Sequence, residues 1–231
     1  MKYEKVIEAI FIKRPNRFIA HVLIDGVEEI VHVRNTGRCK ELLIPGAKVI
    51  LEDCSHNLKR KTKYSLIAVW KDNMLVNMDS QIPNAAVFKA INENRILGLE
   101  NLNHIRREVT FGNSRFDIYF ESETEKGFVE VKGVTLEENN IAMFPDAPTM
   151  RGAKHVLEMI EVVKQGYRGI LFFLLQMKGP TKFIPNYKMD KVFSDALKLA
   201  SENGVEILVY DSIIKSDEII VDKIVNMDSL I

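Results

Sequence analysis

Runs of alternating apolar and polar residues fill the first part of the chain, and we expect turns between them at the pairs Pro15-Asn16, Asp25-Gly26, Pro45-Gly46 and Asp72-Asn73. An alternation with a period of two is typical of β-strands that bury one face. Asp25-Gly26 between two β-rich runs predicts a tight hairpin. The predicted strands span residues 5–13, 17–24, 27–34, 48–53, 64–71 and 74–77. So many short strands in about 80 residues predict a small closed barrel of the OB type over residues 1–82.

The pattern changes after Pro83 to spacings of three and four, which predict helices, mixed with apolar runs that predict strands. Thr149 can cap one long helix, and a loop over residues 144–148 precedes it. The predicted elements are helix 84–94, strands 105–111, 115–121 and 127–132, a helix from Thr149 to Gly166 or Gly169, strand 170–176, helix 190–203 and strand 205–210. This order predicts an α/β domain over residues 83–231, in which helices flank a mixed sheet in the α+β manner.

Alternation along two neighbouring strands predicts where three polar side chains lie. Asp117 would point to one face of strand 115–121, and the other face would hold Phe116, Ile118 and Phe120. Glu130 and Lys132 would share one face of strand 127–132. The linker between the strands is short and polar, so they should pair as a hairpin that brings Asp117 close to Glu130 and Lys132.

Two carboxylates from adjacent strands form an oxygen site of the kind that Mg²⁺ or Mn²⁺ prefers. Such an ion can activate water and neutralise charge on a phosphate oxygen, and a nearby lysine can assist. Asp117, Glu130 and Lys132 are therefore candidate catalytic residues for phosphodiester hydrolysis, with Asp117 and Glu130 as metal ligands. The alternative is a cross-strand ion pair on a solvated sheet face.

The helix that begins at Thr149 carries Arg151, Lys154 and His155 near its N-terminus, where free N–H groups and the helix dipole favour an anion. We expect these side chains to contact a phosphate backbone. The alternatives are a solvated basic face for Lys154 and a hydrogen-bonded interior position for His155.

Two segments of the predicted barrel are rich in cations and are candidate nucleic-acid contacts. The first is dense in polar donors with no obvious capping duty, and the second has its cations beside Tyr64, an arrangement suited to holding single strands. The first comprises Arg34, Asn35, Thr36, Arg38 and Lys40, and the second Lys59, Arg60, Lys61 and Lys63. A solubilising loop is the alternative for the lysine-rich segment.

Charge and composition narrow the class of protein. The net charge is zero, but residues 1–80 carry 14 Lys and Arg against 10 Asp and Glu, so nucleic-acid affinity must come from local patches. Two cysteines, Cys39 and Cys54, are too few for a disulfide framework, and we expect both to be reduced. No stretch approaches the roughly 20 apolar residues of a membrane span. We therefore expect a cytoplasmic protein with no membrane partner.

Three parts of the chain, residues 32–46, residues 115–117 with 128–136, and residues 143–155, resemble the sugar fermentation stimulation protein family of DNA-binding proteins. The resemblance implies an OB-like barrel followed by a restriction-endonuclease-like domain similar to the PD-(D/E)xK nucleases. It also implies non-specific DNA binding and a regulatory link to sugar (maltose) metabolism. By position, Asp117, Glu130 and Lys132 would be the nuclease-type triad, although Phe116 stands where the superfamily has proline.

The main hypothesis is thus a DNA-binding protein with a Mg²⁺-dependent or Mn²⁺-dependent nuclease site. The second is a catalytically silent DNA-binding regulator on a nuclease scaffold. A third is a small-molecule enzyme that uses the same acidic cleft, although no dinucleotide or phosphate-loop motif supports it. The sequence leaves open whether the partner is single-stranded DNA, duplex DNA or RNA, and which oligomer forms.

Overall fold

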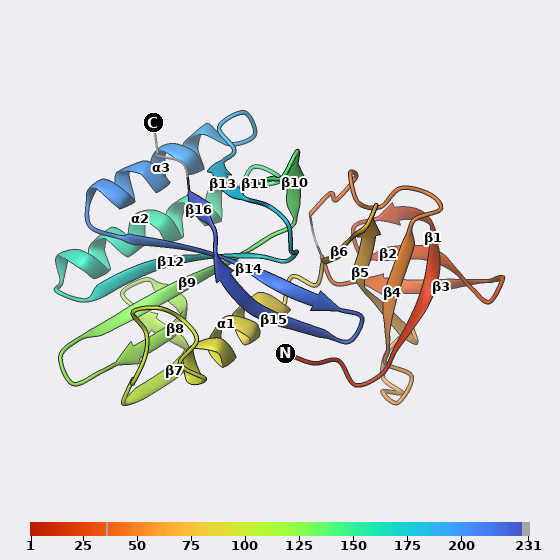
Figure 1. Cartoon of the computed structure of the whole chain (residues 1–231), viewed down its shortest axis with the longest axis horizontal. Helices are drawn as coiled ribbons and strands as arrows, with labels where there is room; N and C mark the ends of the chain where they lie inside the picture. The colour runs from red at the N-terminus through yellow and green to blue at the C-terminus, as the bar shows by residue number, and fades with distance from the viewer. Residues whose placement is uncertain (36, 228–231) are drawn as a thin grey trace.

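The computed structural model describes residues 1–35 and 37–227. They form a β-barrel and a larger α/β domain, which lie side by side in Figure 1. The first three residues leave the barrel and pair with the second domain, where Met1 and Tyr3 exchange backbone hydrogen bonds with residues of the strand β15 (Glu218–Ile224) and the turn before it. None of the helices in the described part of the chain is long and apolar enough to span a membrane.

The barrel is an antiparallel sheet that closes on itself. The strands are β1 (Val6–Asn16), β2 (Ile19–Ile24), β3 (Val27–Val33), β4 (Lys48–Asp53), β5 (Tyr64–Lys71) and β6 (Met74–Asn77). Their order is β3-β2-β1-β4-β5-β6, and a parallel pairing of β3 with β5 closes the ring. The barrel predicted from the alternation is confirmed. Cys39 and Cys54 are free and buried, as expected.

Two turns of the barrel test the turn positions predicted from the sequence, and only one of them is confirmed. Asp25 and Gly26 both have positive φ, as the predicted tight hairpin between β2 and β3 requires. The turn predicted at Pro15-Asn16 is wrong, because β1 continues through Pro15 to Asn16 with an irregular register. Asn16 instead closes the following turn, where its side-chain oxygen accepts the N–H groups of Phe18 and Ile19.

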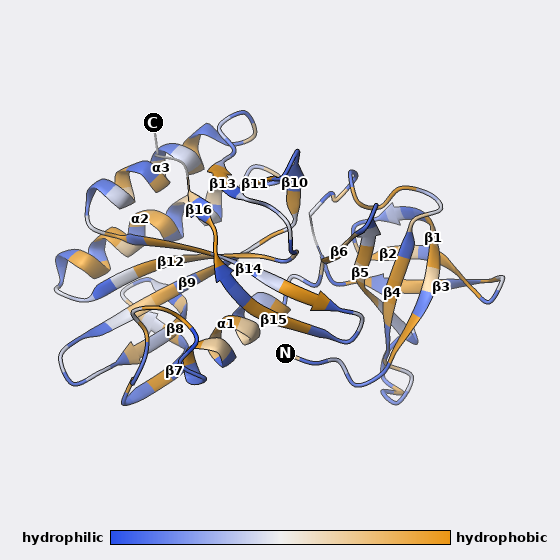
Figure 2. Ribbon diagram, viewed as in Figure 1, coloured by the Kyte–Doolittle hydropathy of each residue, from blue (hydrophilic) through white to orange (hydrophobic). Residues whose placement is uncertain are grey.

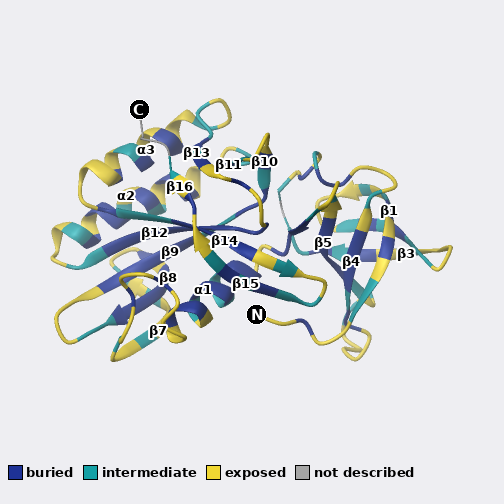
Figure 3. Ribbon diagram, viewed as in Figure 1, coloured by how far each residue is buried: buried dark blue, intermediate teal, exposed yellow. Residues whose placement is uncertain are grey.

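The α/β domain is built on a mixed six-stranded sheet of order β15-β14-β12-β9-β8-β7. Besides β15, the strands are β7 (His104–Phe111), β8 (Ser114–Glu121), β9 (Lys126–Val134), β12 (Arg168–Leu175) and β14 (Glu206–Lys215). The central strands β9, β12 and β14 are parallel to one another, and β12 is buried almost throughout. A sheet covered on both faces requires such a continuous apolar run, and Figure 3 shows its centre buried.

Helices cover both faces of this sheet. They are α1 (Ile82–Asn92), α2 (Met150–Lys164) and α3 (Lys191–Glu202). α1 contacts β8, β9 and β15, whereas α2 packs on β9, β12 and α3. The orange stripes of α2 and α3 in Figure 2 mark the apolar faces that they bury. Thr149 caps α2 as predicted, because its hydroxyl accepts the N–H of Gly152, and Gly166 follows the end of the helix with positive φ.

A second, four-stranded sheet was missed by the sequence patterns. It has the order β10-β11-β13-β16 and consists of β10 (Leu136–Glu138), β11 (Ile141–Phe144), β13 (Lys182–Pro185) and β16 (Asn226–Met227). The predicted loop therefore begins only after Phe144. Strands of two to four residues are too short for an alternation to be recognised. These strands are defined by their pairings, among them that of β11 with β13 from a distant part of the chain.

Arg34 connects the barrel to the segment that leads into the α/β domain. Its guanidinium donates to Glu52 on β4 and, at 3.1 Å, to Asp79 just before α1. The Asp79 side chain is 0% exposed, and burial raises its pKa while Arg34 opposes that rise. Gln176, after β12, donates to the Asp79 carbonyl. A buried carboxylate is tolerated here because a cation and polar partners surround it.

Arg34→Ala is expected to destabilise the protein by about 3 kcal/mol, because it leaves the Asp79 carboxylate buried without its cation. The measurement is the free energy of unfolding in urea. Lys61→Ala is the matched control, since Lys61 is an exposed barrel cation without a side-chain partner among the described residues. Equal stability of the two variants would contradict the assignment.

Candidate functional site

Asp117 lies where β8 separates from β9. The two strands pair from Glu121–Lys126 to Ile118–Val129, and the regular ladder stops there. At the next position the Asp117 carboxylate accepts the N–H of Val131 at 2.7 Å. Its other oxygen accepts the side-chain amide of Asn84 from α1. The side chain thus takes over a backbone hydrogen bond, and both of its oxygens are held in place.

Where β8 separates from β9, the neighbouring residue Phe116 lies on a different face of the sheet from the one predicted. Phe116 was expected on the face of Ile118 and Phe120, but it packs in a different hydrophobic cluster, against Phe128 and near His155. Because β8 no longer follows β9 beyond Ile118, the alternation of side chains is interrupted there. The prediction for Phe116 was wrong for this reason.

Glu130 projects from β9 toward the ammonium of Lys132 and the ring of His155. One carboxylate oxygen, Oε1, accepts Lys132 Nζ at 2.6 Å and contacts His155 Nδ1 at 2.7 Å. The other oxygen, Oε2, is buried and has no hydrogen-bond partner among the described residues. Leaving a buried acceptor without a partner costs about 1–3 kcal/mol. An oxygen in that state is suited to receive a cation or a donor from a bound ligand.

Burial and the nearby Glu130 carboxylate raise the pKa of Asp117 to about 7. The Val131 N–H and the Lys132 ammonium act in the opposite direction but are outweighed. The two carboxylates lie close together in a poorly solvated place, where the charge of Glu130 disfavours the ionisation of Asp117. A divalent cation bound between them would remove this repulsion and favour the ionised form of both.

Asp117 and Glu130 line one cavity of about 360 Å³. Its walls also carry Asn84, Lys132, Arg151 and His155, and Thr149 and Gly152 at the start of α2. In the described part of the chain no group of three or more His, Cys, Asp and Glu side chains is arranged to hold a metal. A cation held by two carboxylates would complete its shell with water or phosphate oxygens, as Mg²⁺ commonly does. The donor set therefore fits a hard divalent cation.

The three predicted contacts at the start of α2 differ in position. Arg151 is exposed and lines the carboxylate cavity. His155 is mostly buried and bonded to Glu130, so its geometry matches the hydrogen-bonded alternative. Lys154 is exposed, lies outside the cavity lining, and reaches Glu158 one turn along the helix at 3.5 Å. Arg151 and His155 therefore line the cavity, whereas Lys154 does not.

In the barrel, the segment that follows β3 has structural duties that the sequence did not reveal. Asn35 was thought to lack a capping role, but its side-chain oxygen accepts the N–H of Gly37, and its amide donates to the carbonyl of Met78. Arg34 is held by its two carboxylates. Thr36 lies outside the described residues. Arg38 and Lys40 remain exposed and line a second cavity.

The lysine-rich segment lies apart from both cavities. Lys59, Lys61 and Lys63 are exposed, and none of them lines either cavity. Arg60 donates to Ser65 at 2.6 Å, and Tyr64 packs against the barrel core. The Tyr64 ring is therefore partly used in packing, which weakens the expectation that it stacks on a base.

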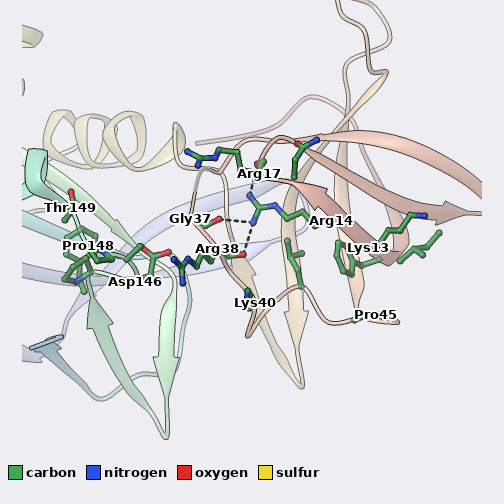
Figure 4. A pocket seen from close by; sticks show the side chains of 17 residues that line it. Lys13, Arg14, Arg17, Gly37, Arg38, Lys40, Pro45, Asp146, Pro148 and Thr149 are labelled. Carbon is green, nitrogen blue, oxygen red and sulfur yellow. Dashed lines mark hydrogen bonds between the residues drawn. The ribbon is translucent and has the colours of Figure 1, made fainter. Parts of the chain in front are cut away.

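The second cavity, of about 950 Å³, lies between the barrel and the α/β domain. We call it the interdomain cleft. The barrel side carries Lys13, Arg14 and Arg17 besides Arg38 and Lys40, and the other side is the segment from Phe144 to Thr149 (Figure 4). Lys13, Arg14 and Arg17 were not among the nucleic-acid contacts predicted from the sequence. The signal was present as Lys13-Arg14-Pro15-Asn16-Arg17, a basic run that was interpreted only as a turn.

Comparisons with known proteins agree with this fold. The family model described as "Sugar fermentation stimulation protein RE domain" matches residues 81–218, and the "SfsA N-terminal OB domain" matches residues 12–78. A sugar fermentation stimulation protein homolog of Alkaliphilus oremlandii is 66% identical over 99% of both chains. A homolog of Clostridium botulinum (strain Langeland) is 51% identical over 99% of this chain and 100% of the relative.

A solved structure, described as Pyrococcus furiosus SfsA in complex with Ca²⁺, is also similar. It is 31% identical, the TM-score is 0.89, and the match covers 99% of this chain and 98% of that one. The predicted fold class, an OB-type barrel followed by a mixed α/β domain, is confirmed. The family model that matches residues 81–218 is described as an RE domain, which agrees with the restriction-endonuclease-like architecture that was expected.

The raised pKa of Asp117 predicts a dependence of stability on pH. An unfolded aspartate ionises near pH 4, whereas Asp117 in the fold ionises near pH 7. Between these values the folded state holds a proton that the unfolded state has lost, so this group's contribution to stability falls as the pH rises. Asp117→Asn should therefore gain stability relative to the unaltered protein between pH 5 and pH 8. Urea unfolding in EDTA at both pH values measures this difference, and the same difference at both would refute the prediction.

Proposed function

The chain belongs to the sugar fermentation stimulation protein family, and we propose that it binds nucleic acid and hydrolyses phosphodiester bonds with a divalent cation held by Asp117 and Glu130. The observation that carries the proposal is the buried Oε2 atom of Glu130, which has no partner among the described residues. Glu130 and Asp117 line the same cavity. The charge of Glu130 also contributes to the raised pKa of Asp117.

The Ca²⁺ in the description of the Pyrococcus furiosus relative supports a cation here, since that protein shares the fold over nearly the whole chain. A bound Mg²⁺ or Mn²⁺ would supply Lewis acidity, which makes water a better nucleophile and offsets charge on a phosphate oxygen. In such a cavity, the two carboxylates of this chain would be the protein ligands, and phosphate and water would provide the remaining oxygens.

The surrounding side chains have separate roles in this proposal. Asn84 and the Val131 N–H fix both oxygens of Asp117. Lys132 and His155 contact Oε1 of Glu130, and Oε2, which has no partner among the described residues, would bind the cation. Lys132 also brings a positive charge to the cavity, where it can stabilise the developing charge on a phosphate. Arg151 at the N-terminus of α2 would orient the phosphate group.

Nucleic acid is the proposed partner because the surfaces next to the carboxylates are cationic. Arg151 lines the carboxylate cavity, and the interdomain cleft beside it carries five Lys and Arg side chains on the barrel. A polyanion is the ligand that such a distribution favours on a chain without net charge. We propose DNA as the substrate, and RNA is the alternative that the cleavage assay compares with it.

A second candidate function is a DNA-binding regulator that does not cleave, which for this family would act in sugar metabolism. The observation that favours it is the pairing of Lys132 with Glu130 at 2.6 Å. A lysine engaged in this way is partly neutralised. A protein that kept the pair permanently would bind DNA on a nuclease scaffold without turnover.

Cleavage of labelled single-stranded DNA, duplex DNA and RNA in Mg²⁺, Mn²⁺ or EDTA tests the proposal. The unaltered protein is expected to cleave at least one of them with Mn²⁺ or Mg²⁺ and to lose activity in EDTA. Glu130→Gln removes the anionic ligand but keeps a side chain of the same size, so activity should fall by at least about 100-fold, as for the loss of one key electrostatic group.

Lys61→Ala is the control and should retain activity, because Lys61 is exposed and lines neither cavity. Calcium binding by titration calorimetry gives a readout that is independent of turnover, and Glu130→Gln should weaken it. Metal-dependent cleavage that survives in Glu130→Gln would remove the carboxylate site from consideration. DNA binding without cleavage in any metal would favour the regulator.

A further inference from the structure

We propose that the interdomain cleft is the path of a single-stranded nucleic acid, with its phosphates along the barrel wall and its bases along the segment from Phe144 to Pro148. The substrate class is therefore a single strand, or a duplex with a single-stranded tail, and not a blunt duplex. This inference extends the proposed function, because it supplies the route by which a strand reaches Asp117 and Glu130.

The barrel wall of the cleft offers cations that nothing else in the fold uses. Lys13, Arg17, Arg38 and Lys40 line the cleft, and all four are exposed. None of these side chains has a hydrogen bond or ion pair within residues 1–35 and 37–227. Charged groups that are exposed and unpaired can contact phosphates without first breaking an internal interaction.

Arg14 fixes the geometry of this wall. Its guanidinium donates to the backbone carbonyls of Arg17, Asn35, Gly37 and Arg38 over 2.6–2.9 Å. These bonds join the end of β1 to the segment after β3, so the unpaired cations on both segments are held close to one another, as Figure 4 shows for Arg17 and Arg38. Ordering the wall before a ligand arrives lowers the entropy cost of binding.

The opposite wall differs in chemistry. It is formed by Phe144, Pro145, Ala147 and Pro148, with Asp146 as its one carboxylate. Asp146 approaches the barrel closely, because a Cβ atom on Gly37 would lie 2.5 Å from one of its oxygens. A carboxylate would repel phosphates, whereas the apolar surface that Ala147 and Pro148 leave accessible can contact the faces of bases. The phosphates therefore belong on the barrel side and the bases on this side.

The cleft leads to the carboxylate cavity. Phe144 and Thr149 line both of them, so a strand that occupies the cleft continues directly to Asp117 and Glu130. Glu130, whose Oε2 atom is buried without a partner among the described residues, lines a cavity of about 360 Å³. A duplex is stiffer than a single strand, so drawing one of its phosphates into such a cavity costs deformation energy that an unpaired strand avoids.

The test measures binding in EDTA, where the proposed cleavage cannot occur. The probe is a fluorescein-labelled single strand of about 12 nucleotides, the size that one OB fold covers, compared with a blunt duplex of the same length. Arg17→Ala/Arg38→Ala is expected to weaken single-strand binding on the order of tenfold. It should also reduce the slope of log K against log salt by about 1.4, as expected for two lost phosphate contacts.

Two further variants make the result specific. Lys61→Ala/Lys63→Ala removes two exposed barrel cations outside the cleft and should change the affinity by less than about twofold. Arg17→Lys/Arg38→Lys keeps the charges and should recover most of the binding. Melting temperatures equal to that of the unaltered protein confirm that all variants are folded. An equal loss in the Lys61/Lys63 variant, or equal affinity for single strand and blunt duplex, would overturn the inference.

The outcome is separable from that of the cleavage assay. If the protein cleaves with Mn²⁺ but the Arg17/Arg38 variant binds and cleaves normally, the route through the cleft is wrong and the metal site stands. If no metal supports cleavage but this variant loses single-strand binding, the cleft stands and the hydrolytic function fails.

Discussion

The hydrogen bond from the Val131 N–H to the Asp117 carboxylate is the interaction on which the candidate site depends. It takes the place of strand pairing where β8 leaves β9, and in doing so it draws a carboxylate into the fold. The same departure turns Phe116 toward the α2 side and opens the space that the cavity occupies. Burial of Asp117 beside Glu130 then raises the pKa of Asp117. One change in backbone pairing thus yields both the position and the electrostatics of the site.

The fold gives one carboxylate oxygen of Glu130 two polar partners and gives the other oxygen none among the described residues. Lys132 and His155 both contact Oε1, so the buried carboxylate has a cationic partner in Lys132 and a second polar partner in His155. Oε2 has none within the described residues and carries a cost in stability. An unsatisfied acceptor is costly in a poorly solvated place. In the proposed function, a cation bound at Oε2 would remove that cost.

The junction of the two domains links the barrel to this site. Arg34 holds Glu52 and Asp79 together, Asn35 binds the carbonyl of Met78, and Arg14 gathers the carbonyls of the same segment. Gly37 then passes so close to Asp146 that a larger residue would collide with it. These contacts fix the barrel wall of the cleft opposite the segment that leads into α2. The barrel and the carboxylates therefore form one continuous surface rather than two separate sites.

The sequence by itself determined the features that depend on neighbours along the chain. Alternation placed the barrel strands and set Glu130 and Lys132 on one face, and the Asp25-Gly26 hairpin and the Thr149 cap followed from local hydrogen bonding and backbone preference. Tertiary structure alone decided which side Phe116 faces, the structural duty of Asn35, the short strands β11 and β13, and the meeting of Arg17 with Arg38 in one cleft. Each of these rests on partners distant in sequence. A periodic pattern records what one segment buries, but it does not record which remote segment supplies the hydrogen bond, the ring or the charge that it meets.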